Sequence, residues 1–313
     1  MARFNYGGQA LIEGVLMRGR DAIAVAFRHP DGHIVWAAEP LDSGPHAWRL
    51  ARAPLVRGLV VLYETLVVGT RWLIRSANIQ AAQDDVEIGR GMVAVMLGIT
   101  AVAGIGVFFL VPLFVAQAVT SNSGSIVQHL IEGLVKVGLL LGYLAVISRT
   151  PDIRRVFMYH GAEHMTIHAL EAGDPLTTDN VRRYPTAHPR CGTEFLVVLI
   201  ALSIVAFALI GRQDIVVGSV TRVLLIPVLA AVGYEVLRWG AKHRANPIVK
   251  AIMAPGILVQ MITTKRPTDD QIEVAIVSME QALEADGESV PAGSDLPERE
   301  RLDPERAAAA PPG

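Results

Sequence analysis

A cluster of histidines and glutamates lies in the segment YHGAEHMTIHALEAGD, within a chain that is otherwise strongly apolar. Five such residues fall within twelve positions: His160, Glu163, His164, His168 and Glu171. If a helix begins at Pro151, the rotation of about 100° per residue places the histidines and Glu171 on one face, with Glu163 at its edge. The spacing therefore predicts a helix that presents metal-ligating and acid–base groups together.

The first part of this cluster has the order H-x-x-E-H, formed by His160, Glu163 and His164. Inverted-motif zinc proteases use this order, with the histidines as zinc ligands and the glutamate activating the zinc-bound water. Imidazoles four residues apart on a helix lie about 6 Å apart, so both can reach one ion at about 2.1 Å from each ring nitrogen. We therefore expect a divalent metal, zinc in the first instance, on the two histidines and Glu163 as general base.

A third ligand has to come from elsewhere, because His168 lies two helical turns, about 12 Å, from His160. The first candidate is Glu235, which ends the last long apolar segment and follows His164 by 71 positions (235 − 164 = 71). The third ligand of the inverted-motif proteases follows at a similar separation. His168 is a further candidate, either as an alternative ligand or as a partner of one.

Two other segments supply alternative ligands. The sequence HPRCG contains His188 and Cys191, a nitrogen–sulfur pair that zinc accepts. Together with His160 and His164, this pair would complete a closed, structural four-ligand site. The glycine-rich start, YGGQALIEGVLMRG, predicts tight turns or close backbone approach, and Glu13 would join the cluster if this segment folds back onto it.

Four long apolar segments predict a mainly α membrane protein with four transmembrane helices, because crossing a bilayer takes roughly 20 predominantly apolar residues. Hydrophobic residues make up 51% of the 313 residues, and charged residues 19%. The segments are Gly91 to Val119, Leu130 to Ser148, Phe195 to Gly211 and Val216 to Glu235. Lys and Arg gather before the first segment, between the second and third, and after the fourth. The chain is therefore expected to lie in the cytoplasmic membrane, with the lipid bilayer as a partner and with both termini and the loop at 149–194 in the cytosol.

The remaining segments predict smaller, soluble elements. Residues 1–50 are expected to form a region with a small β-hairpin around HPDG, and residues 51–90 an amphipathic helix at the membrane interface with a linker. The four-span region is placed at 91–262. Residues 263–285 are expected to form a cytosolic amphipathic helix that begins with a capping box, Thr268 with Gln271, and residues 286–313 a disordered tail.

Composition excludes several classes of function. A formal net charge of −2 gives no basic field for nucleic acid, and the glycine-rich start lacks the Lys-Ser/Thr pair of a phosphate-binding loop, so neither nucleic acid nor nucleotide is expected as a ligand. The single cysteine excludes an internal disulfide. Glu132, Lys136 and Arg222 lie inside apolar segments at similar depth, where a structural ion pair is favoured over a transport site.

Several strings in the expected order give the chain a close resemblance to the YqhQ-like family of bacterial integral membrane proteins. They are YGGQALIEGVLMRG, RRVFMYHGAEHMTIHALEAG, HPRCGTEFL and APGILVQMITTKRPTDDQIEVAI. The resemblance covers the chain to about Leu283, and departs from the family pattern at Met165 and Glu194. It implies a membrane protein with a domain of unknown function, in a family described as predicted metal-dependent enzymes.

The leading hypothesis from the sequence is a metal-dependent hydrolase that acts at the cytosolic face of the membrane. Its metal would be held by His160, His164 and Glu235, and its substrate would be a peptide or another membrane-associated amide or ester. The alternative is a scaffold or assembly factor with the closed zinc site and a protein partner. A small transporter that uses the charged residues of the apolar segments ranks third.

Overall fold

A small β-sheet begins the chain in this computed structural model, which describes residues 6–41, 53–81, 89–120, 124–189, 191–243, 246–295 and 297–302. Four antiparallel strands follow one another: β1 (Gly7–Leu11), β2 (Gly14–Arg18), β3 (Ala22–Arg28) and β4 (Ile34–Pro40). A fifth strand, β5 (Arg299–Arg301), pairs in parallel with β4. The predicted hairpin is present as β3 and β4, and the glycine-rich start adds two strands that the sequence analysis did not predict.

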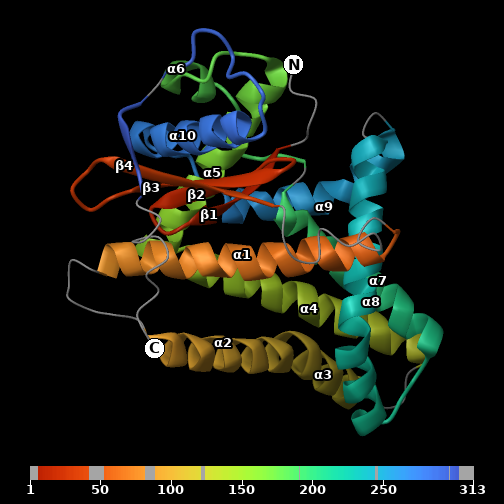
Figure 1. The fold of residues 1–313 in the computed structure, drawn as a ribbon. Helices are drawn as coiled ribbons and strands as arrows, with labels where there is room; N and C mark the ends of the chain where they lie inside the picture. Colours follow the sequence, from red (N-terminus) through yellow and green to blue (C-terminus); the bar gives the residue numbers. More distant parts are fainter. Residues whose placement is uncertain are drawn as a thin grey trace.

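Helices cover both faces of this sheet (Figure 1). On one face lie α5 (Pro151–Ala172) and α10 (Asp269–Ala285), and on the other lies α1 (Val56–Ala81). Because the strands alternate their side chains, Val15 and Met17 face α5 and α10, whereas Leu16 and Val25 face Trp72 of α1. The inner strands are therefore buried on both sides.

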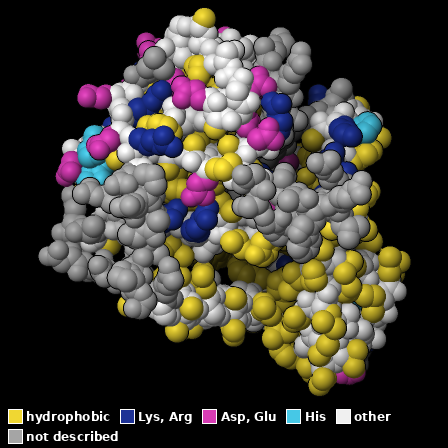
Figure 2. All heavy atoms as spheres, in the orientation of Figure 1, with side chains coloured by type: hydrophobic (Ala, Val, Ile, Leu, Met, Phe, Trp, Pro, Cys, Tyr) yellow, Lys and Arg dark blue, Asp and Glu magenta, His cyan; other side chains and the backbone are white. Residues whose placement is uncertain are grey.

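Within the described residues, four helices are long and apolar enough to cross a membrane, as the sequence predicted. The first combines α2 (Arg90–Ile105), a π-helical turn η4 (Gly106–Leu110) and α3 (Val111–Val119); the others are α4 (Ser125–Ile147), α7 (Gly192–Ile210) and α8 (Ile215–Lys242). Figure 2 places hydrophobic side chains over this lower part of the molecule and charged ones over the sheet and its helices. The surface thus divides into an apolar and a charged part.

A shorter apolar helix, α9 (Pro247–Thr263), follows α8 and packs against α7 and α4. The sequence analysis did not separate it from the four-span region. With 17 residues it is shorter than the roughly 20 residues that a membrane span needs. Its last residues lead directly to the face of α5 that carries the histidines.

The C-terminal part of the chain belongs to the sheet unit, by which we mean the β-sheet together with α1, α5 and α10 that cover it. The predicted capping box, Thr268 with Gln271, begins α10. This helix is not a separate amphipathic element, since Ile272, Ile276 and Met279 are fully buried in the core between the sheet and α5. The expected disorder from residue 286 is wrong for the segment that forms β5, because pairing with β4 orders it; residues 303–313 lie outside the described residues.

Candidate metal centre

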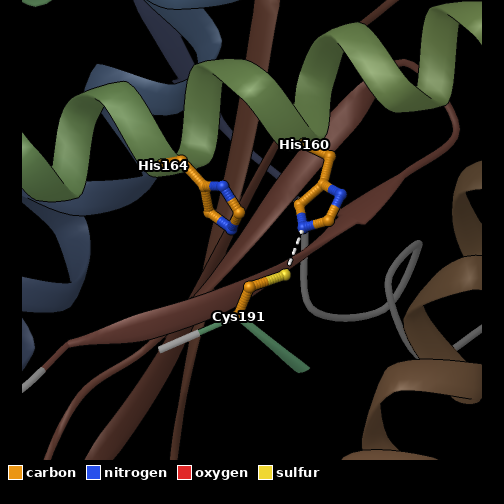
Figure 3. A group of neighbouring side chains, drawn as sticks. All are labelled: His160, His164 and Cys191. Carbon is orange, nitrogen blue, oxygen red and sulfur yellow. Dashed lines mark hydrogen bonds between the residues drawn. The ribbon is translucent and has the colours of Figure 1, made fainter. Parts of the chain in front are cut away.

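Three side chains from two separate segments of the chain converge between α5 and the start of α7 (Figure 3). His160 and His164 extend from consecutive turns of α5, and Cys191 is the residue that caps the start of α7. One ligand atom from each lies within 4.8 Å of the other two. His160 Nε2 is 3.1 Å from Cys191 Sγ, so the two are in direct contact.

Backbone carbonyls fix the orientation of both imidazoles. His160 Nδ1 lies 2.9 Å from the carbonyl oxygen of Thr263, and His164 Nδ1 lies 2.6 Å from that of Thr186. A carbonyl oxygen only accepts hydrogen bonds, so both Nδ1 atoms carry their protons. Each Nε2 is therefore unprotonated, and its lone pair, which in His160 accepts from the Cys191 thiol, is the one that metal-ligating histidines use.

Close backbone approach brings these carbonyls to the histidines. The chain after α9 passes over Gly161, where an added Cβ would lie 2.1 Å from the carbonyl oxygen of Lys265. On the other side, the backbone of His188 exchanges two hydrogen bonds with the side chain of Gln260, at 2.8 and 3.0 Å. Glycine in α5 and glutamine in α9 thus position the two segments that orient the imidazoles.

Glu163 lies between the two histidines in sequence and is 4% exposed. The backbone N–H of Gly8 hydrogen-bonds its carboxylate, while its Oε2 is buried with no hydrogen-bond partner among the described residues. Burial raises the pKa of this carboxyl to about 8, the nearby His160 opposes the shift, and Cys191 adds to it. The fold therefore keeps one carboxylate oxygen unsatisfied beside the imidazoles.

Burial also favours the neutral forms of two of the converging groups. It lowers the pKa of His164 to about 2, and His160 contributes to the same shift. It raises the pKa of the Cys191 thiol, against hydrogen bonds from Thr193. A neutral imidazole is the form that binds a metal, and a cation at this place would stabilise the thiolate that an apolar surrounding disfavours.

Two nitrogens and one sulfur form a donor set that suits zinc. Structural zinc sites have four protein ligands, whereas catalytic sites have three and leave one position for water or substrate. Within the described parts of the chain, the group contains three ligands. The residues present thus fit an open, zinc-type site with an unsatisfied carboxylate oxygen next to it.

His168 and His188 form a separate group with Glu171 farther along α5. His188 Nε2 lies 3.4 Å from Glu171 Oε2, and His168 Nε2 donates to the carbonyl oxygen of Ala187 at 3.0 Å. The ring centroids of His164 and His188 are 5.8 Å apart. The closed set of two histidines with His188 and Cys191 is therefore not assembled, since His188 belongs to the second group.

The structure does not place Glu235 at the centre. Its carboxylate accepts hydrogen bonds from the Arg57 guanidinium, 2.8 Å from Nε, and from the backbone N–H of Leu55 at 3.1 Å. The expectation that it supplies the third ligand is therefore corrected: Arg57 occupies the carboxylate of Glu235, and the group that lies with the two histidines is Cys191. The spacing of soluble proteases does not transfer to a chain with this topology.

Glu13 also lies away from the centre, although the glycine-rich start does fold back onto α5. Both oxygens of Glu13 accept hydrogen bonds from Arg155 at 2.5 Å, and Tyr159 donates to one of them at 3.2 Å. Glu13 thus contacts α5 at Arg155 and Tyr159, whereas Gly8 approaches Glu163: an added Cβ on Gly8 would lie 3.1 Å from Glu163 Oε1. The sequence indicated the close approach through its glycines, but not which residue makes it.

A second buried polar cluster lies among the membrane-length helices. Glu132 of α4 accepts hydrogen bonds from Arg222 of α8 at 2.9 and 2.5 Å, and Lys136 Nζ lies 3.0 Å from its Oε1. All three side chains are buried. This is the ion pair that the sequence analysis favoured over a transport site.

Comparison with known proteins identifies relatives of this chain. Residues 53–285 match a family described as "Protein of unknown function (DUF1385)". The chain is 34% identical over 292 residues to the uncharacterized protein YqhQ of Bacillus subtilis, covering 89% of this chain and 92% of that protein. No solved structure matches. With most of its length matched by the family model, and YqhQ aligned almost end to end, the chain belongs to the DUF1385 family.

Proposed function

We propose that this protein is a membrane-embedded, metal-dependent hydrolase whose zinc ion is held by His160, His164 and Cys191. The observation that carries the proposal is the convergence of two imidazoles with fixed Nδ1 protons on a cysteine sulfur, next to a buried carboxylate with an unsatisfied oxygen. A solvated helix face would not bring these groups together with His164, Cys191 and Glu163 buried and His160 half-buried. The excess of Lys and Arg in the segments around the site supports a position at the cytosolic side of the membrane.

In this proposal Glu163 acts as the general base. Zinc, when bound, supplies a Lewis acid that polarises the scissile carbonyl and lowers the pKa of a water. Burial favours the neutral carboxyl, and a nearby cation would favour its ionised form; in that form Glu163 takes one proton from the attacking water through Oε2 and passes it to the leaving nitrogen or oxygen. The water's oxygen forms the new bond to the acyl carbon while the bond to the leaving group breaks. Thr263 and Thr186 hold the imidazoles in the ligating orientation throughout.

Metal content of the full-length protein in detergent tests this proposal. Purified wild-type protein is expected to carry about one zinc ion per chain. Cys191→Ser should lose most of it, whereas Glu163→Gln should retain it and lose hydrolysis of a p-nitrophenyl acyl ester. Glu235→Gln is the matched control, because it changes a carboxylate that pairs with Arg57, and it should retain the metal. Metal-free wild-type protein, or equal metal in wild type and Cys191→Ser, would contradict the proposal.

A second candidate rests on the 3.1 Å contact between Cys191 Sγ and His160 Nε2. A cysteine nucleophile beside a histidine base, whose other nitrogen donates to Thr263, is the arrangement of cysteine hydrolases. Such a nucleophile needs a lowered pKa, and burial raises the pKa of this thiol. The zinc proposal is therefore favoured. Ester hydrolysis that persists after chelation and is blocked by alkylation of Cys191 would support the thiol mechanism instead.

A further inference from the structure

A cavity of about 600 Å³ lies between the start of α7, the end of α8 and α9. Cys191 forms part of its wall, so the cavity reaches the candidate metal ligand. Its volume is within the range of small-molecule sites, about 300 to 1,000 Å³. A molecule held there would lie directly against the proposed centre.

Hydrophobic side chains make up most of the cavity wall. They come from the ends of two helices and include Leu237, Val249, Met253 and Ile257. The cavity lies where α8, a membrane-length helix, ends and the shorter α9 begins. On α9, Ile252 and Leu258 are largely exposed, so this helix offers an apolar surface beside the cavity. Both features suit an acyl chain that enters from the bilayer.

Two cations stand at the cavity, Arg238 of α8 and Lys250 of α9. Both are exposed, and among the described residues neither forms an ion pair. The acidic residue of the wall, Glu194, is 3% exposed and lies inside the protein. The mouth of the cavity is therefore positive, while its interior is mostly apolar apart from Glu194, and this distribution complements an anionic headgroup on a hydrocarbon chain.

We propose that this cavity binds an anionic phospholipid of the membrane, with an acyl chain along Leu237 and Met253 and the phosphate between Arg238 and Lys250. The inference deepens the proposed function, on which it rests, by naming the substrate class: a lipid whose acyl chain lies against Cys191. Binding itself needs no metal, so it can be tested separately from the zinc site.

The test uses full-length protein in phosphatidylcholine nanodiscs, stripped of metal with a chelator, and the fact that Cys191 is the single cysteine of the chain. Dioleoylphosphatidylglycerol is titrated in, and the rate of Cys191 alkylation by N-ethylmaleimide is followed. The anionic lipid should slow alkylation, whereas the same amount of added phosphatidylcholine should not. The double variant Arg238→Gln/Lys250→Gln should need about tenfold more anionic lipid for the same protection, since each exposed ion contact is worth up to ~1 kcal/mol.

Two further variants keep the result interpretable. Lys242→Gln removes a nearby exposed cation of α8 that does not line the cavity, and should leave the protection unchanged. Ala241→Phe fills the cavity without altering its charge, and should abolish protection while the thermal unfolding midpoint stays near the wild-type value. Equal protection by phosphatidylcholine, stronger protection by oleate than by the phospholipid, or protection that survives the double replacement would overturn the proposal. Zinc content is measured on a portion of each preparation before the chelator is added, so failure of lipid binding by a protein that carried zinc would leave the metal centre standing.

Discussion

Two buried carboxylates, Glu132 and Glu163, are 2% and 4% exposed and are held in opposite ways. Both oxygens of Glu132 are occupied, by Arg222 and Lys136. Glu163 has the N–H of Gly8 on its carboxylate, while its Oε2 has no partner among the described residues. The comparison teaches that burial alone does not mark a functional carboxylate, because a buried charge can be structural when its partners saturate it.

The largest expected effect is a difference in the free energy of unfolding between variants of the two carboxylates. Glu132→Gln leaves Lys136 and Arg222 buried without their counter-charge and should destabilise the protein by about 3–5 kcal/mol. Glu163→Gln replaces an unsatisfied oxygen with a similar amide and should change stability by no more than about 1 kcal/mol. Thermal or denaturant unfolding of the detergent-solubilised protein measures both. Equal destabilisation by the two changes would break the comparison.

Metal affinity gives the next largest effect. Removing the sulfur ligand in Cys191→Ser should weaken zinc binding by at least about a hundredfold, because even residues that only support metal ligands contribute ten- to hundredfold. Competition with a chromophoric chelator measures the affinity. His168→Gln is the matched control, since His168 belongs to the second group with Glu171 and His188, and it should leave the affinity of the first site within a few-fold of wild type. An equal loss in both variants would mean that the two groups act as one.

A glycine substitution tests how the backbone supports the centre. Gly161→Ala places a Cβ 2.1 Å from the carbonyl oxygen of Lys265, so the segment after α9 has to move away from α5. We expect a loss of about 1–3 kcal/mol in stability and weaker zinc binding, because the same segment orients His160 through Thr263. Gly98→Ala in α2, where no atom lies within 4 Å of an added Cβ, should not destabilise the protein. Wild-type affinity in Gly161→Ala would show that the carbonyl contact is dispensable.

The smallest effect concerns a third buried carboxylate, Glu280, which pairs with Arg299 of β5. Burial raises its pKa to about 7, against the opposing effect of Arg299. A carboxyl with a raised pKa in the folded state binds a proton that the unfolded state has released, so this group favours folding less as pH rises from about 4.5 to 7. Glu280→Gln lacks this dependence and should gain stability relative to wild type over that interval. Glu284→Gln, at a more exposed position on the same helix, should not reproduce it.

Periodicity and length predicted much of the fold, because they are local properties of the sequence. The four membrane-length helices, the hairpin of β3 and β4 and the capping box at Thr268 are present as expected. The sheet around the hairpin was not predicted, since β1 and β2 are short and interrupted by glycine, and β5 pairs with a strand more than 250 residues earlier in the chain (299 − 34 = 265). Long-range pairing of this kind leaves no periodic signal.

The candidate site was predictable in part for the same reason. The imidazoles and Glu163 lie on one helix, so their spacing brings them together whatever the rest of the fold does. The third group comes from another segment, and spacing alone pointed to Glu235 as the first choice. Two facts that only the three-dimensional structure gives select Cys191 over Glu235. Arg57 on α1 lies near Glu235 and neutralises it, and Cys191 caps the start of α7.

The position of α9 and α10 after the last membrane-length helix has a consequence for biogenesis. The carbonyl of Thr263 that orients His160, and the α10 side chains that complete the core against α5, leave the ribosome only after α2, α4, α7 and α8 have done so. A nascent chain thus carries His160 without the carbonyl that orients it, although Thr186, which orients His164, is already present. The three-residue group can therefore take its final arrangement only after α9 has been synthesised and has packed against the rest of the protein.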